Sequence, residues 1–172
     1  MYPQYPDALI ARLLRSVKTI AMVGASPNEV RPSFFAMKYL TEKGFKVIPV
    51  NPTAVGKEIL GQKVYAAVSD LPAPVDMVDI FRNSEAAGPI TDEVIANKER
   101  LGVKVLWMQL GVINEEAARR AEAAGLTVIM NRCPKIEYGR LSGEIGWYGV
   151  NRRIIDNRKP YAFAQGGSLR RG

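Results

Sequence analysis

The reactive side chains of this sequence are defined first by what is missing, because its 172 residues include no histidine and one cysteine. A Ser-His-Asp or Cys-His apparatus, a phosphohistidine intermediate and a His-ligated zinc site all need an imidazole. A single cysteine also excludes a Cys-rich metal site. The sequence therefore predicts no metal site and no catalytic residues. Carboxylate, lysine, tyrosine or lone-thiol chemistry stays open, as does binding without catalysis.

The one cysteine, Cys133, has Arg132 before it and Lys135 two positions after it. Positive neighbours favour a thiolate, so a reactive Cys133 is predicted to have a lowered pKa. A lone cysteine where a strand ends is more often simply packed. Among the acids, Glu115 and Glu116 suit the first turn of a helix, and no acidic pair has a spacing that supports acid–base catalysis.

Small or hydrogen-bonding residues follow each of five apolar runs. They are Gly24-Ala25-Ser26, Asn51-Pro52, Arg82-Asn83-Ser84, Gln109-Leu110-Gly111 and Asn131-Arg132. In an open parallel sheet, ligands bind outside the carboxyl ends of the strands. If the five runs are strands of one such sheet, these segments meet at the same edge. The sequence therefore predicts a binding site there.

Residues 19–52 would position the first of these segments. An apolar run ends at Val23, a polar loop follows, a helical pattern is headed by Ser33, and a second apolar run ends at Val50. This order is a βαβ unit, the right-handed crossover of a parallel sheet. Its loop opens onto a helix N-terminus, where free N–H groups and the helix dipole favour an anion. The pattern predicts a nucleotide-phosphate site.

The alternation continues along the chain. A helix is expected over residues 6–17, and a short strand-like patch near residues 64–65. Strands are expected over 75–81, 103–108 and 126–130, with Asp76 and Asp79 towards the ends or edges of the first of these. One helix has Pro89 in its first turn, and another starts after the N-cap Asn114. We predict an α/β fold: a three-layer, doubly wound parallel sheet of about five strands.

The pattern is lost from Tyr138, and we expect one domain over residues 1–141 and a basic extension over 142–172 that is partly packed or disordered. The net charge of +7 favours acidic partners, but the basic tail is predicted to be a solvated surface. No apolar run reaches the length of a membrane span, and cysteine usage suits a reducing cytoplasm. A cytoplasmic protein without a membrane partner is therefore expected.

The first loop departs from the dinucleotide fingerprint G-x-G-x-x-G, because Ser26 and Glu29 stand where further glycines belong. The second strand also ends at Asn51, where an NAD site needs an acid for the ribose. Both features disfavour an NAD(P)-dependent oxidoreductase, which is kept as an alternative. An interaction module using the basic tail is a second alternative; nucleic acid is disfavoured as its partner, because no single-strand-binding or helix-turn-helix signature is present.

Several motifs in order resemble the small CoA-binding proteins, whose Rossmann-like domain is similar to the N-terminal domain of the succinyl-CoA synthetase alpha subunit. They are VGAS, RPS and VIPVNP in the first unit, then VDMVDIFRNSE, WMQLGVINEEA and AGLTVIMNRCP. The resemblance covers roughly residues 16–141. It implies that residues 1–141 form a CoA-binding Rossmann-like domain whose ligand is coenzyme A or an acyl-CoA.

The resemblance also implies which residues bind this ligand. In the loop that would hold the phosphates these are Gly24, Ala25, Ser26, Arg31, Ser33 and Phe34, with Ser26, Arg31 and Ser33 as donors. After the second strand they are Asn51 and Pro52. Flanking the adenine or the pantetheine they are Phe81, Arg82, Asn83, Gln109, Leu110, Asn131 and Cys133, and the last could form a mixed disulfide with the coenzyme thiol.

Two departures from the synthetase pattern limit what is carried over. Ala54 stands where that pattern has a lysine, so Arg31, Arg82 or Arg132 must meet the phosphate charge. The synthetase also works through a phosphorylated histidine in a further domain, and this chain has no histidine. The resemblance therefore implies non-catalytic binding, as a CoA sensor or carrier. A protein partner or a homo-oligomer stays open.

Overall fold

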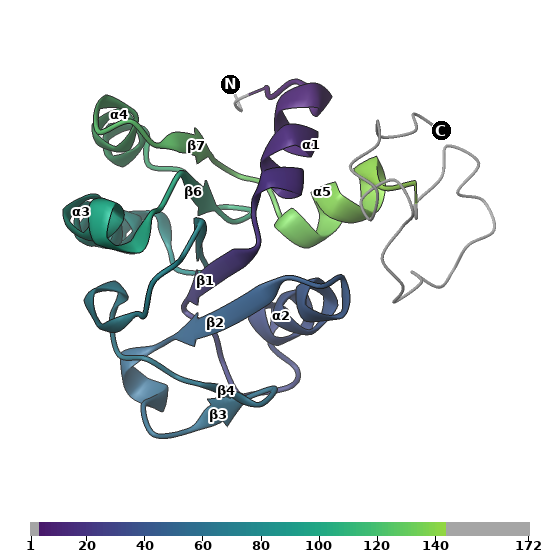
Figure 1. Ribbon diagram of the computed structural model, residues 1–172, viewed down its shortest axis with the longest axis vertical. Coiled ribbons are helices and arrows are strands. Elements are labelled where there is room, and N and C mark those ends of the chain that lie inside the picture. The colour runs from purple at the N-terminus through teal and green to yellow at the C-terminus, as the bar shows by residue number, and fades with distance from the viewer. Residues whose placement is uncertain (1–3, 144–172) are drawn as a thin grey trace.

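The computed structural model describes residues 4–143 and is organised around a five-stranded sheet (Figure 1). The strands are β1 (Thr19–Val23), β2 (Lys46–Val50), β5 (Met77–Ile80), β6 (Val105–Met108) and β7 (Thr127–Ile129). Their spatial order is β2-β1-β5-β6-β7, and every neighbouring pair is parallel. The predicted doubly wound α/β fold is confirmed.

Helices cover both faces of the sheet, which gives the three layers visible in Figure 1. One face carries α1 (Asp7–Ser16), α2 (Pro32–Glu42) and α5 (Pro134–Leu141); the other carries α3 (Ser84–Leu101) and α4 (Glu115–Ala123). Each face encloses its own core, with Met22 and Trp107 in the first and Ile80 and Leu106 in the second. All five residues of β1 are buried, as expected for a parallel strand covered on both sides.

A small hairpin lies beside the edge strand β2. It consists of β3 (Glu58–Ile59) and β4 (Gln62–Lys63), which pair antiparallel. The strand-like patch predicted near residues 64–65 is next to β4: Tyr65 N donates to Pro49 O at 3.0 Å, and Asn51 N donates to Tyr65 O at 2.8 Å. Two single-turn 3-10 helices, η1 (Pro52–Ala54) and η2 (Val68–Asp70), complete the connections.

The start of α3 differs from the prediction, because Pro89 lies inside this helix and not in its first turn. Asn83 caps the helix by accepting a hydrogen bond from Ala86 N at 2.8 Å. The first turn is also tied to the segment before α4: Ile113 N donates to Ser84 Oγ at 3.0 Å, and Asn114 Nδ2 donates to Ser84 O at 2.9 Å. These hydrogen bonds stabilise a helical turn before Pro89, and the position of the proline in the sequence does not predict that turn.

The helix α5 was not predicted, and the loss of pattern at Tyr138 was a wrong expectation up to residue 141. Tyr138 is fully buried and makes edge-to-face contacts with Tyr39 and Phe45, whose ring centroids are 6.1 and 5.7 Å away. Arg140 Nη2 is paired with Asp7 Oδ1 at 2.9 Å, which joins α5 to α1. The proposed extension over 142–172 lies almost entirely outside the described residues, so the domain boundary stays a prediction.

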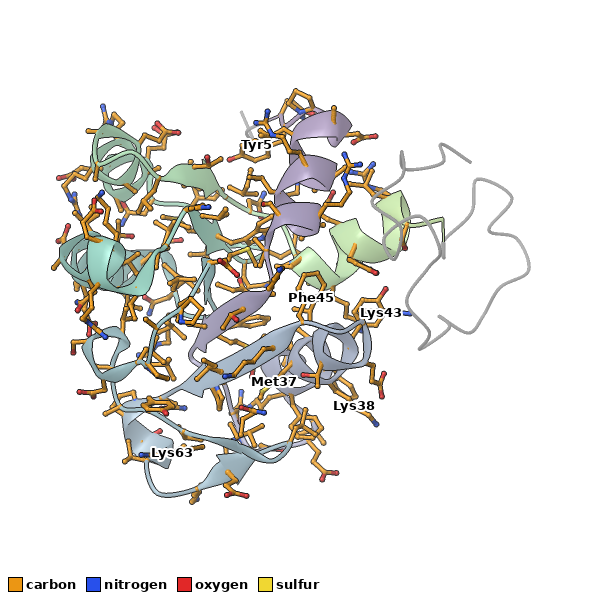
Figure 2. The ribbon with its side chains drawn as sticks, viewed as in Figure 1. Tyr5, Met37, Lys38, Lys43, Phe45 and Lys63 are labelled. Atoms are coloured by element: carbon orange, nitrogen blue, oxygen red, sulfur yellow. The ribbon has the colours of Figure 1, made fainter. Side chains whose placement is uncertain are left out.

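The N-terminal segment is anchored as well. Figure 2 labels Tyr5 ahead of α1, and its hydroxyl accepts a hydrogen bond from Met130 N at 2.8 Å. Of the helices within residues 4–143, none has the length and apolar character needed to cross a membrane.

Gly24 lies where the chain changes its winding direction. The neighbours β1 and β5 continue to opposite sides of the sheet, β1 to β2 and β5 to β6, which makes their carboxyl ends the switch point. Gly24 has φ +92°, and its N–H donates to Val50 O at 2.8 Å. A Cβ atom there would lie 2.3 Å from Phe81 O and 2.9 Å from Arg82 Cδ. Only glycine fits both the backbone conformation and the space.

We therefore expect Gly24→Ala to lower the free energy of unfolding more than Gly125→Ala. Gly125 is the matched control, because its φ is +90° and a Cβ there meets nothing within 4 Å. The control loses about 1–2 kcal/mol from backbone strain, and Gly24→Ala loses about 1–3 kcal/mol more from the steric clash. Urea unfolding of the three proteins measures the difference. Equal losses would show that the contact with Phe81 relaxes without cost.

Candidate functional site

A cavity of about 670 Å³ opens at the carboxyl-terminal edge of the sheet, beside the switch point. This volume is within the range of small-molecule sites, about 300–1,000 Å³. Four segments line it: the loop after β1 with the start of α2, the end of β5, the end of β6, and the start of α5. The lining residues are Val30, Pro32, Phe35, Ala36, Phe81, Arg82, Gln109, Leu110, Val112, Cys133, Lys135 and Ile136.

Five of the predicted ligand-binding residues come together in this cavity: Phe81, Arg82, Gln109, Leu110 and Cys133. Seven further lining residues were missed by sequence reasoning. Most of them are apolar, and an apolar residue in a helix reads as core. Lys135 and Ile136 had no predicted position, because α5 itself was not predicted.

The other ten predicted residues do not line the cavity: Gly24, Ala25, Ser26, Arg31, Ser33, Phe34, Asn51, Pro52, Asn83 and Asn131. The three asparagines among them brace the loops around it. Asn51 Nδ2 donates to Ala25 O at 2.8 Å and so ties the loop after β2 to the loop after β1. Asn83 caps α3, and Asn131 Oδ1 accepts from Gly111 N at 2.8 Å.

Hydrogen bonds within the loop after β1 give it a defined shape. Ser26 N donates to Ser33 Oγ at 3.2 Å, Asn28 N to Ser26 Oγ at 3.1 Å, and Val30 N to Asn28 Oδ1 at 3.1 Å. The chain thereby reaches the start of α2 with Val30 and Pro32 on the cavity wall. Arg31 lies between these two residues, and its side chain is exposed.

The positive charges on the cavity wall come from Arg82 and Lys135. Arg82 follows β5, and its side chain lies across Gly24 in the space that a Cβ there would fill. Arg132, the third arginine considered for phosphate binding, does not line the cavity. Its guanidinium carbon lies 5.6 Å from the ring centroid of Tyr5, and Nη1 donates to Asn131 O at 2.8 Å.

A buried carboxyl group lies next to the cavity floor. Asp79 was expected near an end or edge of its strand, but it is fully buried in β5, between β1 and β6. Burial raises the pKa of Asp79 to about 8, and a hydrogen bond from Gln109 opposes this shift only in part. Gln109 Nε2 lies 3.2 Å from Oδ2 and 3.4 Å from Oδ1 of Asp79. A neutral, hydrogen-bonded carboxyl group is tolerated where an ionised one would not be.

Cys133 forms the other part of the floor, at the N-cap of α5. Burial raises the pKa of its thiol, and Asp79 acts in the same direction once it is ionised, above its own pKa of about 8. Backbone N–H groups of Ile136 and Lys135 and the side chain of Gln109 oppose the shift without cancelling it. The predicted lowering of this pKa was therefore wrong, because burial outweighs the hydrogen bonds that favour a thiolate. The thiol stays protonated at neutral pH.

The arrangement suits binding more than proton transfer. The side chains on the wall supply two cations, one amide, one protonated thiol and a large apolar area. Within residues 4–143 there is no group of three metal-ligating side chains. The site can therefore attract anionic groups at Arg82 and Lys135 and cover an apolar part of the same ligand.

Comparisons with known proteins show the family to which the chain is similar. A family model described as a CoA binding domain matches residues 18–139. The uncharacterized Bacillus subtilis protein YneT is 35% identical over 131 residues, which are 76% of this chain and 93% of YneT. An ADP-forming acetate–CoA ligase of Archaeoglobus fulgidus is 34% identical over 107 residues, 61% of this chain but 15% of the ligase. A solved hypothetical protein from Pyrococcus horikoshii has a TM-score of 0.73 and 38% identity, covering 82% of this chain and 99% of that one.

Asp79→Asn should remove a pH dependence of stability. An unfolded Asp ionises near pH 4, whereas folded Asp79 keeps its proton to about pH 8. Unfolding therefore releases a proton between these values, and the wild-type protein loses up to about 1.4 kcal/mol per pH unit as the pH rises from 4 to 8. Below and above this window the contribution of Asp79 is constant.

Urea unfolding at pH 5, 6, 7 and 8 tests this expectation. Relative to wild type, the Asp79→Asn variant should gain stability at each step, whereas Asp70→Asn, at an exposed position, should leave the profile unchanged. Parallel profiles for wild type and Asp79→Asn would contradict the raised pKa.

Proposed function

We propose, because this chain belongs to the CoA binding domain family, that it binds coenzyme A or an acyl-CoA in the cavity at the carboxyl-terminal edge of its sheet. The observation that carries this proposal is the convergence of Phe81, Arg82, Gln109 and Leu110 on one cavity at the switch point. Ligands of doubly wound sheets bind at this place. The cavity size also suits a ligand of this class.

The phosphates of the coenzyme are assigned to the mouth of the cavity. Arg82 and Lys135 line it, and exposed Arg31 is next to it at the N-terminus of α2. A helix N-terminus favours phosphate through its N–H groups and dipole. Each charge-assisted hydrogen bond contributes about 1.5–3 kcal/mol, so three contacts approach the roughly 8 kcal/mol of a micromolar site. The synthetase pattern has a lysine at the position of Ala54, and these three cations would supply the positive charge that Ala54 lacks.

We further propose that the binding is non-catalytic, as in a CoA sensor or carrier, and that the protein acts in the cytoplasm. Asp79, which is hydrogen-bonded to the lining residue Gln109, is buried and neutral, and the thiol of Cys133 is protonated at neutral pH. Neither state supports a base or a nucleophile. The match to the Archaeoglobus ligase spans 15% of that protein, so its activity is not carried over.

An NAD(P)-dependent activity has less support. Asn51 stands where an acid would bind the ribose, and its side chain is engaged with Ala25 O and Thr53 N. The second alternative, a module acting through the basic tail, concerns residues outside the described range.

Thermal unfolding with different ligands tests the proposal. We expect CoA at 100 times its dissociation constant to stabilise the protein by about 2.7 kcal/mol. Equal concentrations of NAD, NADP and ATP serve as the comparison and should give smaller shifts. Stabilisation by NAD or NADP without any by CoA would contradict the proposal.

Arg82→Ala should weaken CoA binding about tenfold, because it removes a charge-assisted contact at an exposed position. Arg119→Ala is the matched control: it removes the same charge from α4, on the opposite face of the sheet from α2 and α5. Isothermal titration of both variants measures the effect. An equal loss of affinity in the two variants would show that the loss comes from the change in net charge, and that the phosphates do not contact Arg82.

A further inference from the structure

Four large apolar side chains at the cavity remain exposed to solvent. Val30 is 76% exposed, Phe35 52%, Leu110 56% and Ile136 47%. They come from the loop after β1, from α2, from the loop after β6 and from α5, and we call them the apolar rim. Within residues 4–143, two other large apolar side chains are exposed, Val55 and Leu60, and neither lines the cavity. Exposed apolar groups gathered at one place indicate an apolar occupant.

The size and shape of the apolar rim favour a small molecule as this occupant. A stable protein–protein interface takes about 20–30 residues from each partner and buries about 800 Å² per side. The apolar rim has four members arranged around a concave site of about 670 Å³. Because the four side chains come from four segments around this concave site, a ligand bound in it lies among them.

The polar groups of the cavity floor are already engaged. Gln109 directs Nε2 to Asp79, and its Oε1 accepts a hydrogen bond from Leu110 N at 3.4 Å. Cys133 keeps its proton. The floor of the cavity therefore offers few partners for a polar group, and the charged residues Arg82 and Lys135 are assigned to the phosphates of the same ligand. A coenzyme that ends in its polar pantetheine arm would leave the apolar rim in water.

We propose that the apolar rim holds the aliphatic chain of an acyl-CoA, so that the preferred ligand carries an acyl group longer than acetyl. This inference rests on the proposed function, because the apolar rim belongs to the cavity assigned to the coenzyme. Each methylene that moves from water to an apolar surface strengthens binding about fourfold when it is fully buried. An acyl chain on a partly open rim gains about half of this effect in free energy, or about twofold per methylene.

Isothermal titration with CoA, acetyl-CoA, butanoyl-CoA and hexanoyl-CoA tests the inference. We expect roughly a twofold to fourfold gain in affinity per methylene, and at least about a tenfold gain from acetyl-CoA to hexanoyl-CoA. In the double variant Phe35→Ala, Leu110→Ala this gain should fall below about threefold. Val55→Ala is the matched control, because Val55 is 53% exposed and lies outside the cavity; its gain should equal that of wild type.

The outcomes separate this inference from the proposed function. Tight binding of CoA with equal affinities along the acyl series would overturn the inference alone, whereas no binding of any of the four ligands would overturn both. Analytical ultracentrifugation of wild type and the double variant covers the remaining case. A change of self-association with an unchanged acyl gain would assign the apolar rim to contacts between copies and would also overturn the inference. Retention of the native melting transition confirms that each variant is folded.

Discussion

The close approach of β1 and β5 at Gly24 is the constraint on which the site depends. Because position 24 has no side chain, the carbonyl of Phe81 and the stem of Arg82 occupy the space beside it. This contact brings the loop after β1 and the end of β5 together at the switch point. Three hydrogen bonds within residues 26–33 then fix the path of the loop to α2. One wall of the cavity is therefore a consequence of backbone packing, whatever ligand enters.

The second organising feature is polar and lies below the cavity. Asp79 is the third of the four residues of the central strand β5 and is fully buried, so an ionised carboxylate would be energetically unfavourable there; it persists as a neutral group bonded to Gln109. The pair couples the core to the site, because Gln109 is both a partner of Asp79 and part of the cavity lining. The orientation of the Gln109 amide is thus set from inside the protein, and the floor of the cavity is organised without a ligand.

Sequence reasoning predicted the five strands and their edge because short apolar runs that end at Gly or Asn and alternate with helical patterns are typical of a parallel sheet. It missed α5, since the burial of Tyr138 depends on Tyr39 and Phe45, which are far away in the chain. It expected Asp79 towards an end or edge of its strand and did not anticipate the complete burial of this side chain.

The candidate site was recovered only in part, for a related reason. Polar residues after strands, such as Arg82 and Gln109, stand out in a sequence. Apolar residues such as Phe35 and Ile136 look like core, and only the three-dimensional arrangement shows that they are exposed. The asparagines that stand out equally well turned out to brace loops through their own hydrogen bonds, as Asn51 does with Ala25 O.

The connection that follows β2 also affects how this sheet meets other chains. Pro49 has no N–H to offer at the edge strand, and its carbonyl oxygen already accepts from Tyr65. The opposite edge strand, β7, has only three residues. Within residues 4–143, neither edge of the sheet presents a long row of unpaired backbone groups, so these edges resist growth by strand addition and the aggregation that such growth would start.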